Sequence, residues 1–285
     1  NSTWQLMQAK KMLRVNWENV SALESSEMHE QRLIKDLERG EIAESRKDGN
    51  PDAAFAKATK VIERTYSSPF IAHNTLEPMN FFADVKENSV ELIGPTQTPK
   101  ALEDSVSKLL GIPAENITVS MTRIGGGFGR RLYVHFGVEA AAISKKMGAP
   151  IKLIYTREDD MTQGTYRPAY RSVYKAGLDE NNNLIAFSVK GVGLPEGPVF
   201  PNRFPAGAVD NYLAEKKMSR TNISTGAWRA PRSHFTAGAE QAFIDEVAEA
   251  AEKDPIDFRL ELFEKAINNP VGEKYEYDAE RYAGV

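Results

Sequence analysis

The chain has 285 residues, of which 41% are hydrophobic and 27% are charged, and its formal net charge is −4 at pH 7. This composition is typical of a soluble globular protein, and the absence of a basic excess argues against a nucleic-acid-binding surface. The absence of cysteine excludes disulfides, thiolate nucleophiles and cysteine-bound metal clusters within this chain.

The first 50 residues differ in pattern from the rest. Residues 1–11 predict a helix, and LRVNW (13–17) predicts a short strand. Residues 25–47 are charged and helix-favouring, and Gly49, Asn50 and Pro51 then break the pattern. No apolar run is long enough to span a membrane, and no signal peptide is visible. Both ends look cut, so we expect a piece of a longer polypeptide, with residues 1–50 separate from a domain at 51–285.

The middle of the chain predicts an α+β fold. KVIERTYS (60–67) alternates like a strand, and two further strands flank Asn88 as a hairpin. A helix follows, with Thr98 as its cap, Pro99 in its first turn and Gly111 at its end. ITVSMTRI, VEAAAISKKMG and IKLIY then predict strand, helix and strand. The order β-β-α-β-α-β predicts a two-layer arrangement of helices on a mixed sheet.

The last third predicts a long hairpin and two helices. The hairpin turns at Asp179 to Asn183, and the helices cover about 236–252 and 255–267. Residues 192–233 lack periodicity and predict a long loop, and a loop of this length in a compact domain is usually either functional or wrongly assigned.

The strongest local signal is RIGGGFGRR (123–131), between a predicted strand and a predicted helix. Glycine permits positive φ and close approach to a ligand, and consecutive backbone N–H groups can form an anion-binding nest. Arg130 and Arg131 could add charge-assisted bonds to a phosphate group. The spacing matches neither the dinucleotide fingerprint nor the P-loop. These residues alone leave two alternatives equally open, a ligand cradle and a tight turn without a ligand.

Three other segments contain candidate site residues. His73 and Glu77 could be two metal ligands, but turn residues that bond to the backbone are the favoured interpretation. TREDDM (156–161) could bind a cation, but its acids more often cap a turn. GAWRAPRSHF (226–235) places two arginines around Pro231, in a position suited to a carboxylate or phosphate, or else as surface residues packed on Trp228.

Taken together, these segments resemble one family. AHNTLEPMN, PTQTP, the GGGFGRR segment, REDDM and AWRAPR are similar to motifs of the molybdenum hydroxylases, the xanthine oxidase family. The similarity is greatest to the molybdopterin-binding large (beta) subunits of isoquinoline 1-oxidoreductases. It covers residues 57–268, and residues 1–50 would then be the tail of a preceding hammerhead-like region and a linker.

The resemblance implies a molybdopterin cofactor with molybdenum, expected in bacteria as the cytosine dinucleotide. It implies oxidation of N-heteroaromatic or aldehyde substrates with oxygen from water, and electron transfer to [2Fe–2S] clusters on a small partner subunit. It also implies a periplasmic location, with the cytoplasm as the alternative. The cofactor-binding residues that it implies here are Gly126, Gly127, Phe128, Gly129, Arg130, Arg229 and Ala230.

The chain departs from the purine oxidases of the family at two positions. Ile71 stands where they carry a glutamine, and Leu132 stands where they carry an acid, so xanthine is not the expected substrate. The family's general base is a glutamate beyond the region matched here, so no catalytic residue and no metal ligand is expected in this chain. The alternatives are a non-catalytic homologue and a stand-alone module that binds a nucleotide or phosphate.

Overall fold

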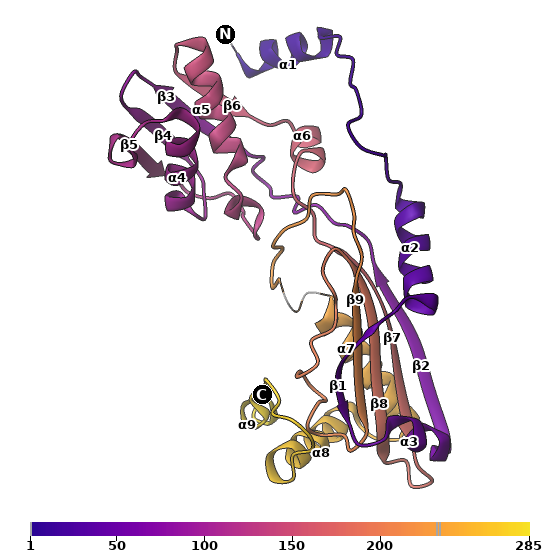
Figure 1. The fold of residues 1–285 in the computed structure, drawn as a ribbon. Helices are drawn as coiled ribbons and strands as arrows, with labels where there is room; N and C mark the ends of the chain where they lie inside the picture. Colours follow the sequence, from indigo (N-terminus) through magenta and orange to yellow (C-terminus); the bar gives the residue numbers. More distant parts are fainter. Residues whose placement is uncertain (1, 232, 234) are drawn as a thin grey trace.

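The computed structural model describes residues 2–231, 233 and 235–285, and the strands in these residues form two separate sheets. Figure 1 shows the smaller sheet at one end of the molecule and the larger sheet at the other, with α1 (Thr3–Met12) beside the smaller one. No helix among the described residues combines the length and the apolar character needed to cross a lipid bilayer.

The smaller sheet has four strands and carries two helices on one face. Its order is β5-β4-β3-β6, with β4 and β5 parallel and the other pairs antiparallel. The elements are β3 (Asn80–Val85), β4 (Val90–Gly94), α4 (Pro99–Leu110), β5 (Ile117–Met121), α5 (His135–Met147) and β6 (Ile151–Ile154). The predicted β-β-α-β-α-β order and its two layers are therefore confirmed. We call residues 79–155 the small-sheet group.

The cap of α4 departs from the prediction. Thr98 is the N-cap residue, but its hydroxyl group donates to the carbonyl oxygen of Leu132 at 2.9 Å instead of accepting from the helix. Pro99 stands in the first turn, and Gly111 ends the helix at φ 69°, as predicted. Thr98 thereby ties the start of α4 to the segment that follows the glycine cluster.

The larger sheet has five strands in the order β1-β9-β8-β7-β2. Its strands are β1 (Ala43–Asp48), β2 (Lys60–Ser68), β7 (Ala169–Leu178), β8 (Leu184–Leu194) and β9 (Tyr212–Met218). Alternate residues of β7 pack on opposite faces, because Tyr174 lies in the core with α7 (Thr236–Ala250) and Val173 lies in the core with α2 (Ser26–Arg39). We call residues 26–68, 169–218 and 235–285 the large-sheet group.

Short helices complete this group. They are α3 (Pro51–Lys57), α8 (Pro255–Asn268) and α9 (Ala279–Ala283), while α6 (Arg157–Thr162) lies between the two groups. Asp254 caps α8 through the N–H groups of Ile256 and Asp257, in agreement with the predicted break before Pro255. The predicted hairpin is confirmed as β7 and β8.

Two predictions about strands were wrong. Residues 13–17 form no strand, because their side chains are exposed and no neighbouring strand pairs with them. The predicted loop at 192–233 contains β9, which pairs in parallel with β8 and antiparallel with β1. Since β1 precedes the predicted boundary at residue 50, the larger sheet includes residues from both sides of it, and the division into domains stays a prediction.

Candidate functional site

The glycine cluster forms the turn between β5 and α5, as predicted. Gly126 and Gly129 have φ values of 104° and 100°, which favour glycine, and Phe128 has a φ of 54°. A side chain at residue 127 would meet Gln97 Oε1 at 2.7 Å, and one at residue 129 would overlap the carbonyl oxygen of Ala227. Glycine is therefore required here both by the backbone conformation and by close neighbours.

Three consecutive N–H groups of this turn have no acceptor within the described residues. The N–H of Gly125 donates to Glu77 Oε2 at 2.9 Å, and the N–H of Gly129 donates to Gln97 Oε1 at 3.2 Å. Between them, the N–H groups of residues 126–128 donate to no atom of the described chain. Such a run of neighbouring donors is suited to an anion.

The segment 226–230 lies directly against this turn. The N–H of Ala227 donates to the hydroxyl group of Tyr133 at 2.7 Å, and its carbonyl oxygen is 2.9 Å from Nε2 of His73. Arg229 is exposed, and its Cζ lies 6.0 Å from the centre of the Phe128 ring. The structure thus brings together two predicted motifs that are about a hundred residues apart. Arg232 and His234 lie outside the described residues.

His73 and Trp228 hold the segment from the side of the protein interior. Their rings lie 6.4 Å apart, and the guanidinium group of Arg167 lies 5.6 Å from the indole ring of Trp228. Burial lowers the pKa of His73, so its imidazole is neutral at neutral pH and Nε2–H donates to Ala227. The described residues contain no group of histidines and acids arranged to hold a metal ion. The favoured interpretation of His73 and Glu77 as residues that bond to the backbone is confirmed.

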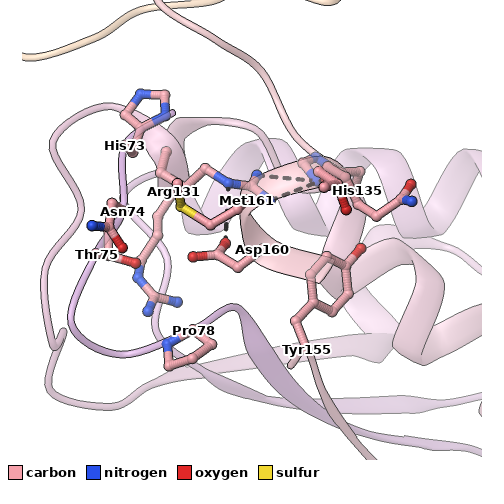
Figure 2. Close-up of polar contacts among 12 residues, drawn as sticks. His73, Asn74, Thr75, Pro78, Arg131, His135, Tyr155, Asp160 and Met161 are labelled. Carbon is pink, nitrogen blue, oxygen red and sulfur yellow. Dashed lines mark hydrogen bonds and ion pairs between the residues drawn. The ribbon is translucent and has the colours of Figure 1, made fainter. Parts of the chain in front are cut away.

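Arg130 points into the protein. Its side chain is 2% exposed, its Nε lies 3.4 Å from Asp160 Oδ1, and its Nη1 donates to His135 Nε2 at 3.1 Å. Burial and the charge of Arg130 lower the pKa of His135, so this ring accepts the hydrogen bond as a neutral group. Figure 2 shows Asp160 among Arg131, His135 and Tyr155. The guanidinium group of Arg130 is thus engaged by protein partners. Its predicted contact with a cofactor stays a prediction.

The acids of the 156–161 segment act within the protein. The hydroxyl group of Thr156 and the carboxylate of Asp159 form a capping box at the start of α6, which confirms the favoured interpretation of this segment. Asp160 is buried and pairs with Arg157, whose guanidinium group also donates to Asn74 and to the carbonyl oxygen of Leu76. Helix α6 therefore anchors the loop that carries His73.

Backbone strain is concentrated in this region. Among the described residues, five other than glycine have positive φ, and Asn74, Phe128 and Ala230 are three of them. Such conformations persist only where the surrounding structure enforces them, and they cluster at functional sites. Gln97 lies in the PTQTP motif, but neither Tyr133 nor Arg167 was predicted as part of the site, because each reaches it through a contact distant in the chain.

Comparisons with known proteins agree with this geometry. The family model described as the molybdopterin cofactor-binding domain matches residues 34–263. A membrane-bound aldehyde dehydrogenase [pyrroloquinoline-quinone] of Gluconacetobacter polyoxogenes is 28% identical over 90% of this chain and 36% of its own length. The isoquinoline 1-oxidoreductase subunit beta of Brevundimonas diminuta is 25% identical over 81% of this chain and 31% of its own.

A solved structure shares the fold. Quinoline 2-oxidoreductase from Pseudomonas putida 86 superposes with a TM-score of 0.70 and 19% identity, over 91% of this chain and 36% of that chain. The chain thus spans about a third of the length of each of these three proteins. The resemblance seen in the sequence motifs is confirmed.

Proposed function

We propose, because this chain belongs to the molybdopterin cofactor-binding domain family, that it forms part of the cofactor site in the large subunit of a molybdenum hydroxylase. The observation that carries the proposal is the contact between the glycine turn and the 226–230 segment. The glycine turn and the 226–230 segment contact each other, although they lie far apart in the chain.

The residues present fit a polyanionic cofactor. Within the described part of the chain, three neighbouring N–H groups lack a protein acceptor, and the exposed cation of Arg229 lies beside the ring of Phe128 at the same turn. The backbone of Gly126 and Gly127 carries two of these N–H groups, and the ring of Phe128 is 47% exposed at the same turn. We assign to these groups, with Gly129 and Ala230 shaping the backbone around them, the binding of the cofactor.

When bound, the molybdenum cofactor supplies the oxidation–reduction chemistry, and the protein contributes binding, orientation and electrostatics. We propose N-heteroaromatic compounds or aldehydes as substrates, as the names of the relatives indicate. Apolar side chains support this choice, because Leu132 is 37% exposed beside the turn and Ile71 lies in the neighbouring loop. We further propose the cytosine dinucleotide form and a small subunit with [2Fe–2S] clusters as the electron acceptor.

We assign no proton-transfer role to this chain. Glu77 is the carboxylate at the turn, and its Oε2 accepts from Gly125 and Arg131 while its Oε1 accepts from Asn80. Both carboxylate oxygens are thus engaged by protein donors that belong to the turn or lie beside it. The role of Glu77 is to hold the turn.

Cofactor analysis of the native, full-length protein that contains this chain, purified from a host that makes molybdenum cofactors, tests the proposal. We expect molybdenum and a pterin in equal amounts, with CMP released by acid hydrolysis. Arg229→Ala should lower both together, whereas the exposed and distant Arg14→Ala should not. A nucleotide without molybdenum would favour the stand-alone phosphate-binding module, and pyrroloquinoline quinone in place of the pterin would also contradict the proposal.

A further inference from the structure

We propose that Arg131 and Glu77 are positioning residues: Arg131 orients the central free N–H group of the glycine turn, that of Gly127, toward the ligand, and Glu77 holds Arg131 and the start of the turn in place. The inference deepens the proposed function and rests on it, because it concerns the same site. The Arg131 side chain is fully buried, and the side chains of both residues are engaged by protein atoms.

The argument starts from the geometry of the peptide unit. In a trans peptide the C=O of one residue and the N–H of the next point in opposite directions. A carbonyl group that is held toward the protein therefore turns the following N–H away from it. Each free N–H of the turn can be traced in this way to the carbonyl group that precedes it.

All three preceding carbonyl groups are held by the protein. The carbonyl oxygen of Gly125 accepts from the N–H of Glu77 at 3.1 Å, and that of Gly127 accepts from the N–H of Arg130 at 2.8 Å. The middle one, Gly126, accepts from Nε of Arg131 at 2.8 Å. Arg131 is thus the side chain that orients the central peptide unit and turns the N–H of Gly127 outward.

Glu77 holds Arg131 in place and secures the start of the turn. Nη2 of Arg131 donates to both the backbone oxygen and Oε2 of Glu77, each at 2.9 Å. Oε2 of Glu77 also accepts from the N–H of Gly125, so one carboxylate oxygen joins the arginine to the turn. Nη1 of Arg131 lies 3.4 Å from the carbonyl oxygen of Pro95.

The unfavourable burial of the Arg131 cation indicates that the Arg131–Glu77 pair has a positioning role. Burial lowers the pKa of Arg131, and the charge of Glu77 opposes that effect. An arginine that only filled space could be replaced by an apolar residue at little cost. Here the planar guanidinium group instead donates in fixed directions to several backbone oxygens, a geometry that lysine cannot reproduce.

Pyrophosphate serves as the probe, with the amide resonances of Gly126, Gly127 and Phe128 observed by NMR and the Kd measured by calorimetry. We expect pyrophosphate to shift these three amides in the unaltered protein. Arg131→Lys should weaken binding about tenfold or more, as expected for loss of an oriented charge-assisted contact. Glu77→Gln, which keeps the shape and an acceptor for Gly125, should weaken it less than Glu77→Ala.

Arg46→Lys is the matched control. Arg46 is also buried, pairs with Asp48 and donates to the backbone oxygens of Val271 and Glu273, but it lies in the large-sheet group. The Arg46→Lys substitution should lower the thermal stability of the protein and leave its Kd for pyrophosphate unchanged. If Arg131→Lys does not fold, the comparison of Glu77→Gln with Glu77→Ala decides by the same readout.

The outcomes separate this inference from the proposed function. If the three amides respond to pyrophosphate and Arg131→Lys abolishes the response, the inference stands even when no molybdenum cofactor is found. If the amides of residues 126–128 do not respond in the unaltered protein, the inference is overturned. Equal losses of affinity in Arg131→Lys and Arg46→Lys would overturn it as well, since they would indicate general destabilisation.

Discussion

Two residues of the candidate site have a backbone conformation that is unfavourable for a residue with a side chain. Phe128 and Ala230 both have positive φ, at 54° and 53°, and lie on the two segments that meet at the site. The Cβ atom of an L-residue is strained in this region of backbone space. The sequence predicted both residues as cofactor contacts but could not predict their backbone angles, which neighbouring segments impose.

Ala230→Gly should therefore stabilise the protein by about 0.5–1 kcal/mol, because glycine adopts positive φ without strain and the lost methyl group is exposed. Urea unfolding at neutral pH measures the change. Ala242→Gly is the control, because residue 242 is an exposed position in the interior of α7 where glycine should cost about 1 kcal/mol. A loss of stability in Ala230→Gly would show that the positive φ is not strained.

His73 should make the stability of the protein depend on pH. Burial lowers its pKa in the folded state, so the folded state disfavours protonation. The stability is therefore complete above the unfolded pKa of about 6.5 and decreases as the pH falls below it. His73→Gln keeps a donor for the carbonyl oxygen of Ala227 but does not titrate.

The thermal midpoint of His73→Gln should therefore fall less between pH 7 and pH 5 than that of the unaltered protein. Some dependence should remain, because burial also lowers the pKa of His135. Parallel curves for the two proteins would contradict the assignment of a neutral, buried His73.

At the scale of elements, the predictions succeeded where the signal is local. Pro99 and Gly111 delimit α4, and Asp254 and Pro255 start α8, because capping and turn preferences act within a few residues. Strand β9 was missed because its sequence YLAEKKM is charged and pairs with strands that are distant in the chain. Its place depends on long-range pairing, which periodicity does not report.

The start of α2 is fixed by another long-range contact. Glu24 is buried just before this helix and accepts from His29, Arg32, Thr221 and the N–H of Asn222. Burial alone would raise its pKa, but these hydrogen bonds outweigh it and lower the pKa to about 2. The stabilisation is thus present above pH 4.5 and is lost as the pH falls toward 2.

Glu24→Gln should destabilise the protein by about 1–3 kcal/mol at pH 7, because a charged acceptor is removed from four donors, of which His29 is buried. Glu27→Gln is the matched control, since Glu27 is exposed in the first turn of the same helix. The difference between the two variants should shrink in unfolding experiments near pH 3. An effect of equal size in both would contradict the role of Glu24 as an anchor.

At the scale of the whole molecule, the candidate site joins two groups of elements. The 226–230 segment, which leads into α7, is contacted by Phe128 and Tyr133 of the small-sheet group and by His73, which lies just before that group in the chain. The motifs could be recognised in the sequence, but the contacts between them could not be predicted, because complete secondary-structure elements separate the motifs along the chain. Ligand sites commonly occupy such junctions.

The two groups have separate hydrophobic cores, and every closely packed pair of elements lies within one group or the other. Few packing contacts therefore couple the cores, so each group should be able to lose structure without the other. Leu102 in α4 and Leu178 in β7 allow a matched test, because both leucines are buried and each belongs to one core.

Leu102→Ala and Leu178→Ala should each destabilise their own core by about 2–5 kcal/mol, the range for a buried leucine replaced by alanine. Hydrogen exchange followed by mass spectrometry measures the effect segment by segment. Leu102→Ala should speed exchange in residues 79–155 and leave β7 and β8 protected, and Leu178→Ala should do the reverse. If either variant speeds exchange equally in both groups, the molecule unfolds as one unit and the site does not join independent parts.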